Sequence, residues 1–213
     1  MMTAKKYFAP LEIAFNSKAS PEEAVYMKKY MRGQFEYFGI KSHIRDEIFK
    51  AFLKEYGLPE MGNLDEYIHY LWTKPQRDFQ YTGMFIVERL LKKTDENLID
   101  ILEYMIINKS WWDTVDYIAT RPVGGYFIKY PAQIKLITEK WMASGNMWLQ
   151  RSALLFQLKY KKNTDEILLY DYITRLAEHK DFFIRKAIGW TLREYSKTNP
   201  KSVEKFIKSH TLS

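Results

Sequence analysis

Cysteine is absent from this chain of 213 residues. Its absence excludes a disulfide framework, a thiolate zinc site, a cysteine-ligated iron–sulfur cluster and a cysteine nucleophile. A chain without cysteine also suits the reducing cytoplasm, and we expect a cytoplasmic location.

Long apolar runs are missing as well. No stretch of the sequence approaches the roughly 18 uncharged apolar residues that a membrane-spanning helix needs. Residues 1–6 include two lysines, but no apolar run follows them. We therefore expect neither a signal peptide nor a membrane partner.

Glycine and proline are scarce, at 9 and 7 residues. Few helix breakers, together with many leucine, isoleucine, lysine, glutamate and methionine residues, favour an all-α fold over a β-sandwich or a β-barrel. Hydrophobic residues make up 46% of the chain, enough for a sizeable core. No low-complexity linker divides the sequence, so we expect residues 1–213 to form a single domain.

The usual sequence motifs of metal and phosphate sites are also missing. The four histidines show no His-x-x-x-His spacing, so we expect no metal site. Neither a glycine-rich phosphate loop nor a Gly-x-Ser-x-Gly elbow occurs, and we expect no cofactor.

Positive charge is in moderate excess, with 33 Lys and Arg against 26 Asp and Glu and a net charge of +7. Such an excess suits a polyanionic partner but also occurs in proteins that bind none. Basic residues interleave with aromatic ones in three places, a pattern that suits phosphate contacts or, alternatively, ordinary solvated helix faces. These clusters are Lys28, Lys29 and Arg32 around Tyr30; Lys159, Lys161 and Lys162 around Tyr160; and Arg185, Lys186, Arg193 and Lys197 around Trp190.

Helical segments follow one another with short breaks between them. We predict helices over residues 21–30, 44–56 and 201–208. Pro75 and Pro131 suit the first turn of further helices, and Gly124-Gly125 suggests a break.

Four aromatic residues recur at intervals of 33, 36 and 35 residues: Phe79, Trp112, Trp148 and Phe183. We place each of them early in a helix. A period of this size is typical of stacked helix pairs, although any helical protein can show such a spacing by chance.

The segment from Ser110 to Ala119 is the most informative. Ser110 and Asp113 resemble a capping box at a helix start. Further along that helix, Trp111, Val115 and Ile118 form an apolar stripe that should face the core.

On the neighbouring face, Trp112 and Asp116 are spaced i, i+4. Core packing does not require a carboxylate here. On the pattern alone, an exposed Asp beside a half-buried Trp is the more ordinary interpretation, because carboxylates are seldom buried. Trp148 and Arg151 form a similar pair, in which we expect Trp148 in the core and Arg151 on a phosphate or on Asp116.

Several separated motifs together resemble the AlkD-type bacterial alkylpurine DNA glycosylases. The resemblance covers about residues 21–206. It rests on Lys109–Asp116 (KSWWDTVD), Trp148–Lys161, Phe183–Trp190, Leu192–Tyr195 and Lys197–Pro200, in that order.

The resemblance implies a right-handed, all-α solenoid of HEAT-like antiparallel helix pairs whose concave, basic face cradles duplex DNA. It implies a monomeric enzyme that excises positively charged 3-methyladenine and 7-methylguanine, without flipping the base into a pocket. Asp116 matches the catalytic carboxylate, and Trp112 and Arg151 lie beside it in the matched cleft. The remaining residues expected to contact DNA are Tyr30, Arg45, Lys159, Arg185, Trp190, Arg193 and Lys197.

Two other functions fit a helical repeat scaffold. One is a non-catalytic protein that binds particular DNA structures, and the other is a protein–protein adaptor with no affinity for DNA. The match at Asp116 and Arg151 favours the enzyme, although a fold alone does not establish catalysis.

Overall fold

The computed structural model describes residues 2–210, and this part of the chain is all-α, as predicted. Its only β-type pairing is an isolated bridge between Glu36 and Gln76. The chain divides into two compact units, Met1–Thr94 and Asp95–Ser213, called unit 1 and unit 2 below. A single domain over residues 1–213 remains a prediction.

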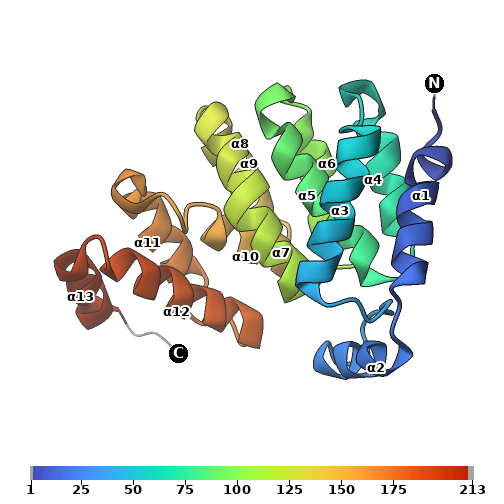
Figure 1. Cartoon of the computed structure of the whole chain (residues 1–213). Coiled ribbons are helices and arrows are strands. Elements are labelled where there is room, and N and C mark those ends of the chain that lie inside the picture. The colour runs from blue at the N-terminus through green and yellow to red at the C-terminus, as the bar shows by residue number, and fades with distance from the viewer. Residues whose placement is uncertain (1, 211–213) are drawn as a thin grey trace. The chain divides into compact units, whose positions relative to one another are not determined.

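Unit 1 is built from five α-helices and two short 3-10 turns among its described residues (Figure 1). Helix α1 packs against α3 and α4, and α4 packs against α5. Aromatic rings fill the centre, where Tyr7, Phe8, Phe52 and Tyr67 form edge-to-face, tilted and stacked contacts. The elements are α1 (Ala4–Ser17), α2 (Pro21–Tyr30), α3 (Ser42–Tyr56), η1 (Met61–Asn63), α4 (Leu64–Thr73), α5 (Arg77–Leu90) and η2 (Leu91–Lys93).

Unit 2 is organised around α10, which packs against α6, α7, α9, α11 and α12, while α13 packs on α12. Trp141 and Phe127 are fully buried in this core. The elements are α6 (Leu98–Ile107), α7 (Trp112–Ile118), η3 (Ala119–Val123), α8 (Gly124–Lys129), α9 (Gln133–Ala143), α10 (Met147–Leu155), η4 (Lys161–Asn163), α11 (Glu166–Arg175), α12 (Phe182–Ser196) and α13 (Pro200–Ser209).

Side-chain caps fix where several helices of unit 2 begin. Asn146, Asp165, Asp181 and Asn199 each accept a hydrogen bond from a backbone N–H in the first turn of the helix that follows. These caps help to explain why the recurring aromatic residues Trp148 and Phe183 lie at the second position of their helices.

The predicted helix at residues 21–30 is confirmed, and the predicted segments 44–56 and 201–208 lie within α3 and α13. The placement of two prolines was wrong. Helix α5 begins at Arg77, after the extended Gln76, so Pro75 lies before it. Pro131 lies in a turn closed by hydrogen bonds of the i to i+3 type, and α9 begins only at Gln133.

The predicted break at Gly124-Gly125 was also wrong. The chain stays helical from Trp112 to Lys129, passing through a five-residue π-helical segment, Ala119–Val123. Pro122 within this segment has no N–H to donate, and the wider π turn tolerates that loss. Gly124 serves packing instead: a Cβ added there would lie 2.6 Å from the carbonyl oxygen of Phe156.

No helix in residues 2–210 has both the length and the apolar character that crossing a membrane requires.

Candidate functional site

Asp116 on α7 and Arg151 on α10 lie against each other in unit 2, 35 residues apart in the sequence. The Nε and Nη2 atoms of Arg151 donate to the two carboxylate oxygens of Asp116, at 2.7 and 2.8 Å. The two planar groups therefore form a bidentate ion pair. The sequence suggested either a phosphate or Asp116 as the partner of Arg151, and in the structure that partner is Asp116.

The guanidinium of Arg151 has a third acceptor. Its Nη1 atom donates to the backbone carbonyl of Phe183, in the first turn of α12. The Arg151 side chain is only 5% exposed, so its charge depends on these acceptors rather than on water. A single side chain thus joins α7, α10 and α12.

The Asp116 side chain is 17% exposed, so part of it remains in contact with solvent. Burial raises its pKa above the ordinary range of an aspartate, and the hydrogen bonds and positive charge of Arg151 partly oppose this rise. Nearby Asp113 adds a smaller upward effect on the same pKa. The interpretation of Asp116 as an ordinary exposed residue was wrong, because Asp116 is mostly desolvated.

Three aromatic rings from the N-terminal ends of α7, α10 and α12 form a cluster beside this ion pair. The ring centroids of Trp111, Trp148 and Phe183 lie 5.1 to 6.0 Å apart. We call these three residues the aromatic triad. Trp148 is half-buried rather than in the core as expected, because the triad lies at the edge of unit 2.

The triad contains Trp111 and not its neighbour Trp112, which is the residue that the repeat spacing singled out. Val115 and Ile118 are fully buried, as the apolar stripe predicted, but Trp111 is only half-buried. Trp112 is half-buried as the first residue of α7, and Trp190 is half-buried on α12.

The prediction of a capping box formed by Ser110 and Asp113 was wrong. Trp111 is the N-cap residue of α7, and its side chain makes no capping hydrogen bond. The Ser110 hydroxyl donates instead to the carbonyl of Ile106, at 2.6 Å, in the last turn of α6. Its oxygen therefore serves the end of the preceding helix.

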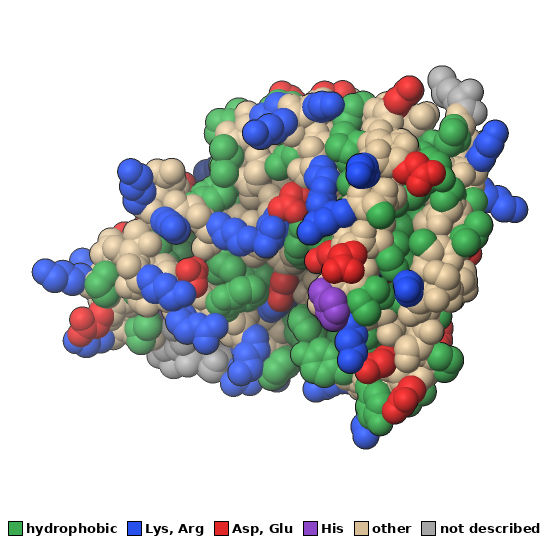
Figure 2. Space-filling view, viewed as in Figure 1, with side chains coloured by type: hydrophobic (Ala, Val, Ile, Leu, Met, Phe, Trp, Pro, Cys, Tyr) green, Lys and Arg blue, Asp and Glu red, His purple; other side chains and the backbone are tan. Residues whose placement is uncertain are grey.

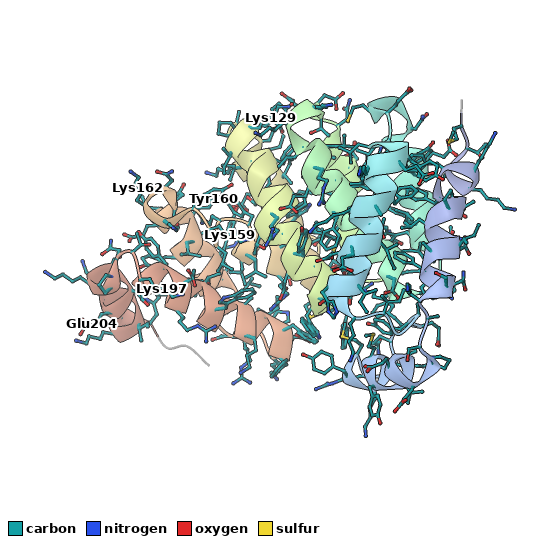
Figure 3. The ribbon with its side chains drawn as sticks, in the orientation of Figure 1. Lys129, Lys159, Tyr160, Lys162, Lys197 and Glu204 are labelled. Carbon is teal, nitrogen blue, oxygen red and sulfur yellow. The ribbon has the colours of Figure 1, made fainter. Side chains whose placement is uncertain are left out.

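The basic residues expected on DNA in unit 2 are all solvent-exposed: Lys159, Arg185, Arg193 and Lys197. Lys and Arg side chains are spread over the visible face of unit 2, with few acidic side chains among them (Figure 2). Lys159, Lys162 and Lys197 project on that side, from the connection after α10 and from the end of α12 (Figure 3). Lys197 also pairs with Glu194 at 2.5 Å. Tyr160 differs from these residues, because its hydroxyl donates to the carbonyl of Gly124 at 2.6 Å and supports the fold.

Tyr30 and Arg45 belong to unit 1. Tyr30, the last residue of α2, is 72% exposed. Arg45 on α3 is mostly buried: its Nη1 atom lies 3.6 Å from a carboxylate oxygen of Asp78, and its guanidinium lies 4.3 Å from the ring centroid of Tyr81. In this structure, therefore, the charge of Arg45 is directed into unit 1.

Asp78 is the partner that sequence reasoning missed. Its side chain is fully buried and accepts a hydrogen bond from the backbone N–H of Phe38, at 3.1 Å. Burial raises the pKa of Asp78, and the bond from Phe38 and the charge of Arg45 partly oppose that rise. An Asp in the first turn of a helix is common, so the sequence held no signal for this role.

A cavity of about 400 Å³ lies between α10, η4, α11 and α12. Of the predicted site residues, only Lys197 lines this cavity, and Asp116 does not. Among residues 2–210, no group of three or more His, Asp or Glu side chains is arranged to hold a metal ion. Asp116 itself offers a mostly desolvated carboxylate paired with a guanidinium.

Comparison with known proteins gave a family and two similar structures. The family described as DNA alkylation repair enzyme matches residues 11–213. A solved structure described as a predicted DNA alkylation repair enzyme from Enterococcus faecalis is 32% identical, with a TM-score of 0.85 over 92% of each chain. The structure of smu.31 from Streptococcus mutans UA159 shares the fold at 19% identity, with a TM-score of 0.59 over 80% of this chain and 90% of that one. No curated protein matches this chain.

Proposed function

Because the chain belongs to the DNA alkylation repair enzyme family, we propose that it is a DNA glycosylase that excises positively charged alkylated purines. Its substrates are 3-methyladenine and 7-methylguanine in duplex DNA, and its product is an abasic site for base excision repair. The protein acts as a cytoplasmic monomer, with HEAT-like helix pairs forming a concave basic surface around the duplex.

The chemistry of the lesion determines what such an enzyme must supply. A purine alkylated at N3 or N7 already carries a positive charge. When its C1′–N9 bond breaks, the bonding electrons neutralise the ring, so no general acid is needed. Water then adds to C1′ and loses a proton. The unfavourable species on this path is the oxocarbenium-like sugar, and a fixed carboxylate stabilises it.

The observation that carries the proposal is the desolvated, oriented carboxylate of Asp116. Both of its oxygens are fixed by Arg151 before any substrate arrives, so the carboxylate needs little reorganisation during the reaction. With 17% of its side chain exposed, Asp116 can still face a sugar that approaches from solvent.

Trp112 and Trp190 extend the site. Both indoles are half-buried, so each keeps some surface exposed to solvent that can face a cationic nucleotide. Such a contact contributes roughly 1–2 kcal/mol when it is desolvated. We propose that the enzyme reaches the lesion from the DNA backbone without flipping the base, and that the exposed basic residues of unit 2, with Tyr30 of unit 1, contact the strands.

Asp116→Asn tests this function. The amide keeps the size of the side chain but lacks the negative charge that stabilises the sugar cation. We expect release of 7-methylguanine from alkylated duplex to fall by roughly 100-fold or more, with DNA binding retained.

Asp171→Asn is the matched control, since Asp171 pairs with Arg175 on the surface of α11. We expect this control to release the base at the wild-type rate. Equal rates for Asp116→Asn and the wild type would exclude Asp116 as the catalytic carboxylate.

One observation favours a second function, that of a DNA-binding protein without catalysis. Arg151 occupies both oxygens of Asp116, and this pairing neutralises the charge that the sugar cation would need. A non-catalytic protein would bind alkylated and plain duplex in a salt-dependent manner, and its wild-type form would release no base.

A further inference from the structure

The ion pair at the proposed active site is anchored from outside the pair. Besides the two oxygens of Asp116, Arg151 has one further acceptor, the carbonyl of Phe183. That carbonyl belongs to the first turn of α12, whereas Asp116 lies on α7. The orientation of the guanidinium therefore depends on how the start of α12 is fixed.

Asp181 fixes the start of α12. It is the N-cap residue of this helix, and its Oδ1 atom accepts a hydrogen bond of 2.6 Å from the backbone N–H of Phe183. The same residue, Phe183, thus receives the cap through its N–H and holds Arg151 through its carbonyl. Its ring also packs in the aromatic triad against Trp111 and Trp148.

The Phe183 carbonyl also affects the charge of the pair. A guanidinium that donates only to Asp116 would direct its whole charge at that carboxylate. The dipole of the Phe183 carbonyl interacts with part of this charge. Because Nη1 donates to that carbonyl, Arg151 meets Asp116 through its other edge, formed by Nε and Nη2. A fixed carbonyl thus keeps the pair in one geometry, with the same part of the Asp116 side chain toward solvent.

We propose that Asp181 is a positioning residue for the active site, acting through the backbone of Phe183 on Arg151 and thereby on Asp116. This role rests on the proposed glycosylase function. Asp181 does not touch the substrate. It holds the first turn of α12 in the place where the Phe183 carbonyl can orient Arg151.

The chain offers a matched control for the loss of a cap. Asp165 is the N-cap residue of α11, and its Oδ1 atom accepts from the N–H of Leu168 at 3.0 Å. Asp165→Ala and Asp181→Ala each remove a capping carboxylate from unit 2. Each should lower the stability to unfolding by about 1 kcal/mol. The Asp181 cap is bonded to the residue whose carbonyl holds Arg151, whereas the Asp165 cap is bonded to Leu168, which has no hydrogen bond to Arg151.

The experiment compares wild type, Asp181→Ala, Asp181→Asn and Asp165→Ala in single-turnover release of 7-methylguanine across the acid and neutral pH range. We expect Asp181→Ala to release the base about tenfold more slowly at saturating enzyme, because a misplaced catalytic group can reduce rates up to about 100-fold. In this variant Arg151 is held less firmly against Asp116, so it lowers the pKa of Asp116 by less than in the wild type. The pH at which activity is half lost should therefore rise, by a fraction of the roughly 1–3 units that a neighbouring opposite charge supplies. Asp181→Asn keeps an acceptor oxygen and should restore both the rate and the pH profile.

A second readout does not need activity. The Nε–H of Arg151, bonded to Asp116, gives an NMR resonance that can be assigned by its loss in Arg151→Gln. We expect Asp181→Ala to shift or broaden this resonance, and Asp165→Ala to leave it unchanged. If Asp181→Ala does not fold, Asp181→Gly removes the same carboxylate at a smaller loss of helix stability.

The outcomes separate this inference from the proposed function. Suppose that the wild type releases the base, and that Asp181→Ala matches Asp165→Ala in rate, pH profile and Arg151 resonance. This result would overturn the positioning role of Asp181 and leave the glycosylase function standing. If the wild type releases no base, the glycosylase function fails. The Arg151 resonance then decides the positioning of the ion pair: a change in Asp181→Ala supports it, and no change overturns it.

Discussion

Arg151 illustrates how one side chain can combine structure and chemistry. Three of its nitrogens donate to acceptors on two other helices, and the residue is 4% exposed. The surface pair of Arg175 with Glu139 has side chains 38% exposed on both partners. Surface pairs contribute about 0–1 kcal/mol, whereas removing one partner of a buried pair costs about 3–5 kcal/mol.

Arg151→Gln should shift the pH dependence of base release. Arg151 lowers the pKa of Asp116 against the upward effect of burial. Without the guanidinium, burial acts unopposed and the pKa of Asp116 rises further. As the pH falls, the variant's carboxylate is therefore protonated at a higher pH than that of the wild type, and base release is lost at that higher pH.

Single-turnover rates across the acid and neutral range measure this shift. Arg175→Gln, which removes an arginine from the surface of the same unit, should keep the wild-type profile. An unchanged acid limb in Arg151→Gln would contradict the role of Arg151 in setting the ionisation of Asp116.

At the scale of elements, the segment that carries Asp116 is one helical run with a change of winding. Helix α7 passes into the π-helical residues Ala119–Val123 directly after the turn that contains Asp116, and then into α8. The hydroxyl of Thr120 donates to the carbonyl of Asp116 at 2.7 Å, which satisfies a carbonyl near the change in winding. Two contacts at Gly124, the first residue of α8, hold this helical run against the residues that follow α10. Gly124 packs on the backbone of Phe156, and its carbonyl accepts a hydrogen bond from the Tyr160 hydroxyl.

Gly124→Ala should destabilise unit 2. The new Cβ would lie 2.6 Å from the backbone oxygen of Phe156, which cannot move aside as a flexible side chain would. We expect a loss of about 1–3 kcal/mol in the free energy of unfolding, measured in urea.

Gly189→Ala is the matched substitution on α12, where no atom lies within 4 Å of the added Cβ. There we expect a gain of about 0.5–1 kcal/mol, because alanine favours a helix more than glycine does. A stability loss at Gly189, or none at Gly124, would contradict this account of the packing.

At the scale of the whole molecule, the net charge of +7 combines with exposed basic residues in both units. Charge of this kind attracts DNA phosphates without reading the base sequence. The proposed enzyme therefore separates two tasks: exposed lysines and arginines bind the strands, and the mostly buried pair of Asp116 and Arg151 acts on the lesion.

Lys159→Gln should weaken binding to alkylated and plain duplex equally. Removing a lysine from one DNA phosphate reduces the slope of log affinity against log salt by about 0.9. Titrations at several salt concentrations give this slope. Lys140→Gln removes a lysine that pairs with Glu103, outside the residues predicted to bind DNA, and should leave the slope unchanged. If Lys159→Gln and the wild type show equal slopes of log affinity against log salt, Lys159 does not contact a DNA phosphate.

The sequence by itself determined the helical class and the placement of the recurring aromatic residues near helix starts. Phe79, Trp112, Trp148 and Phe183 lie within the first three residues of their helices. These features depend on local preferences, on caps and on the periodicity of apolar residues within a few turns. The sequence also indicated a DNA alkylation repair enzyme, and the family match over residues 11–213 confirmed this broader family, whereas the AlkD-type glycosylase activity remains a proposal.

Only the tertiary structure decided which groups meet. The hydrogen bonds of Arg151 to Asp116 and to the Phe183 carbonyl join residues 35 and 32 positions apart. No local pattern contains such distances, because they depend on how α7, α10 and α12 pack. The same reason explains why Trp111 rather than Trp112 belongs to the aromatic triad, and why Gly124 lies inside a helical run. A capping aspartate such as Asp181 is recognisable in sequence, but its link through Phe183 to the pair of Arg151 and Asp116 exists only once the helices are packed.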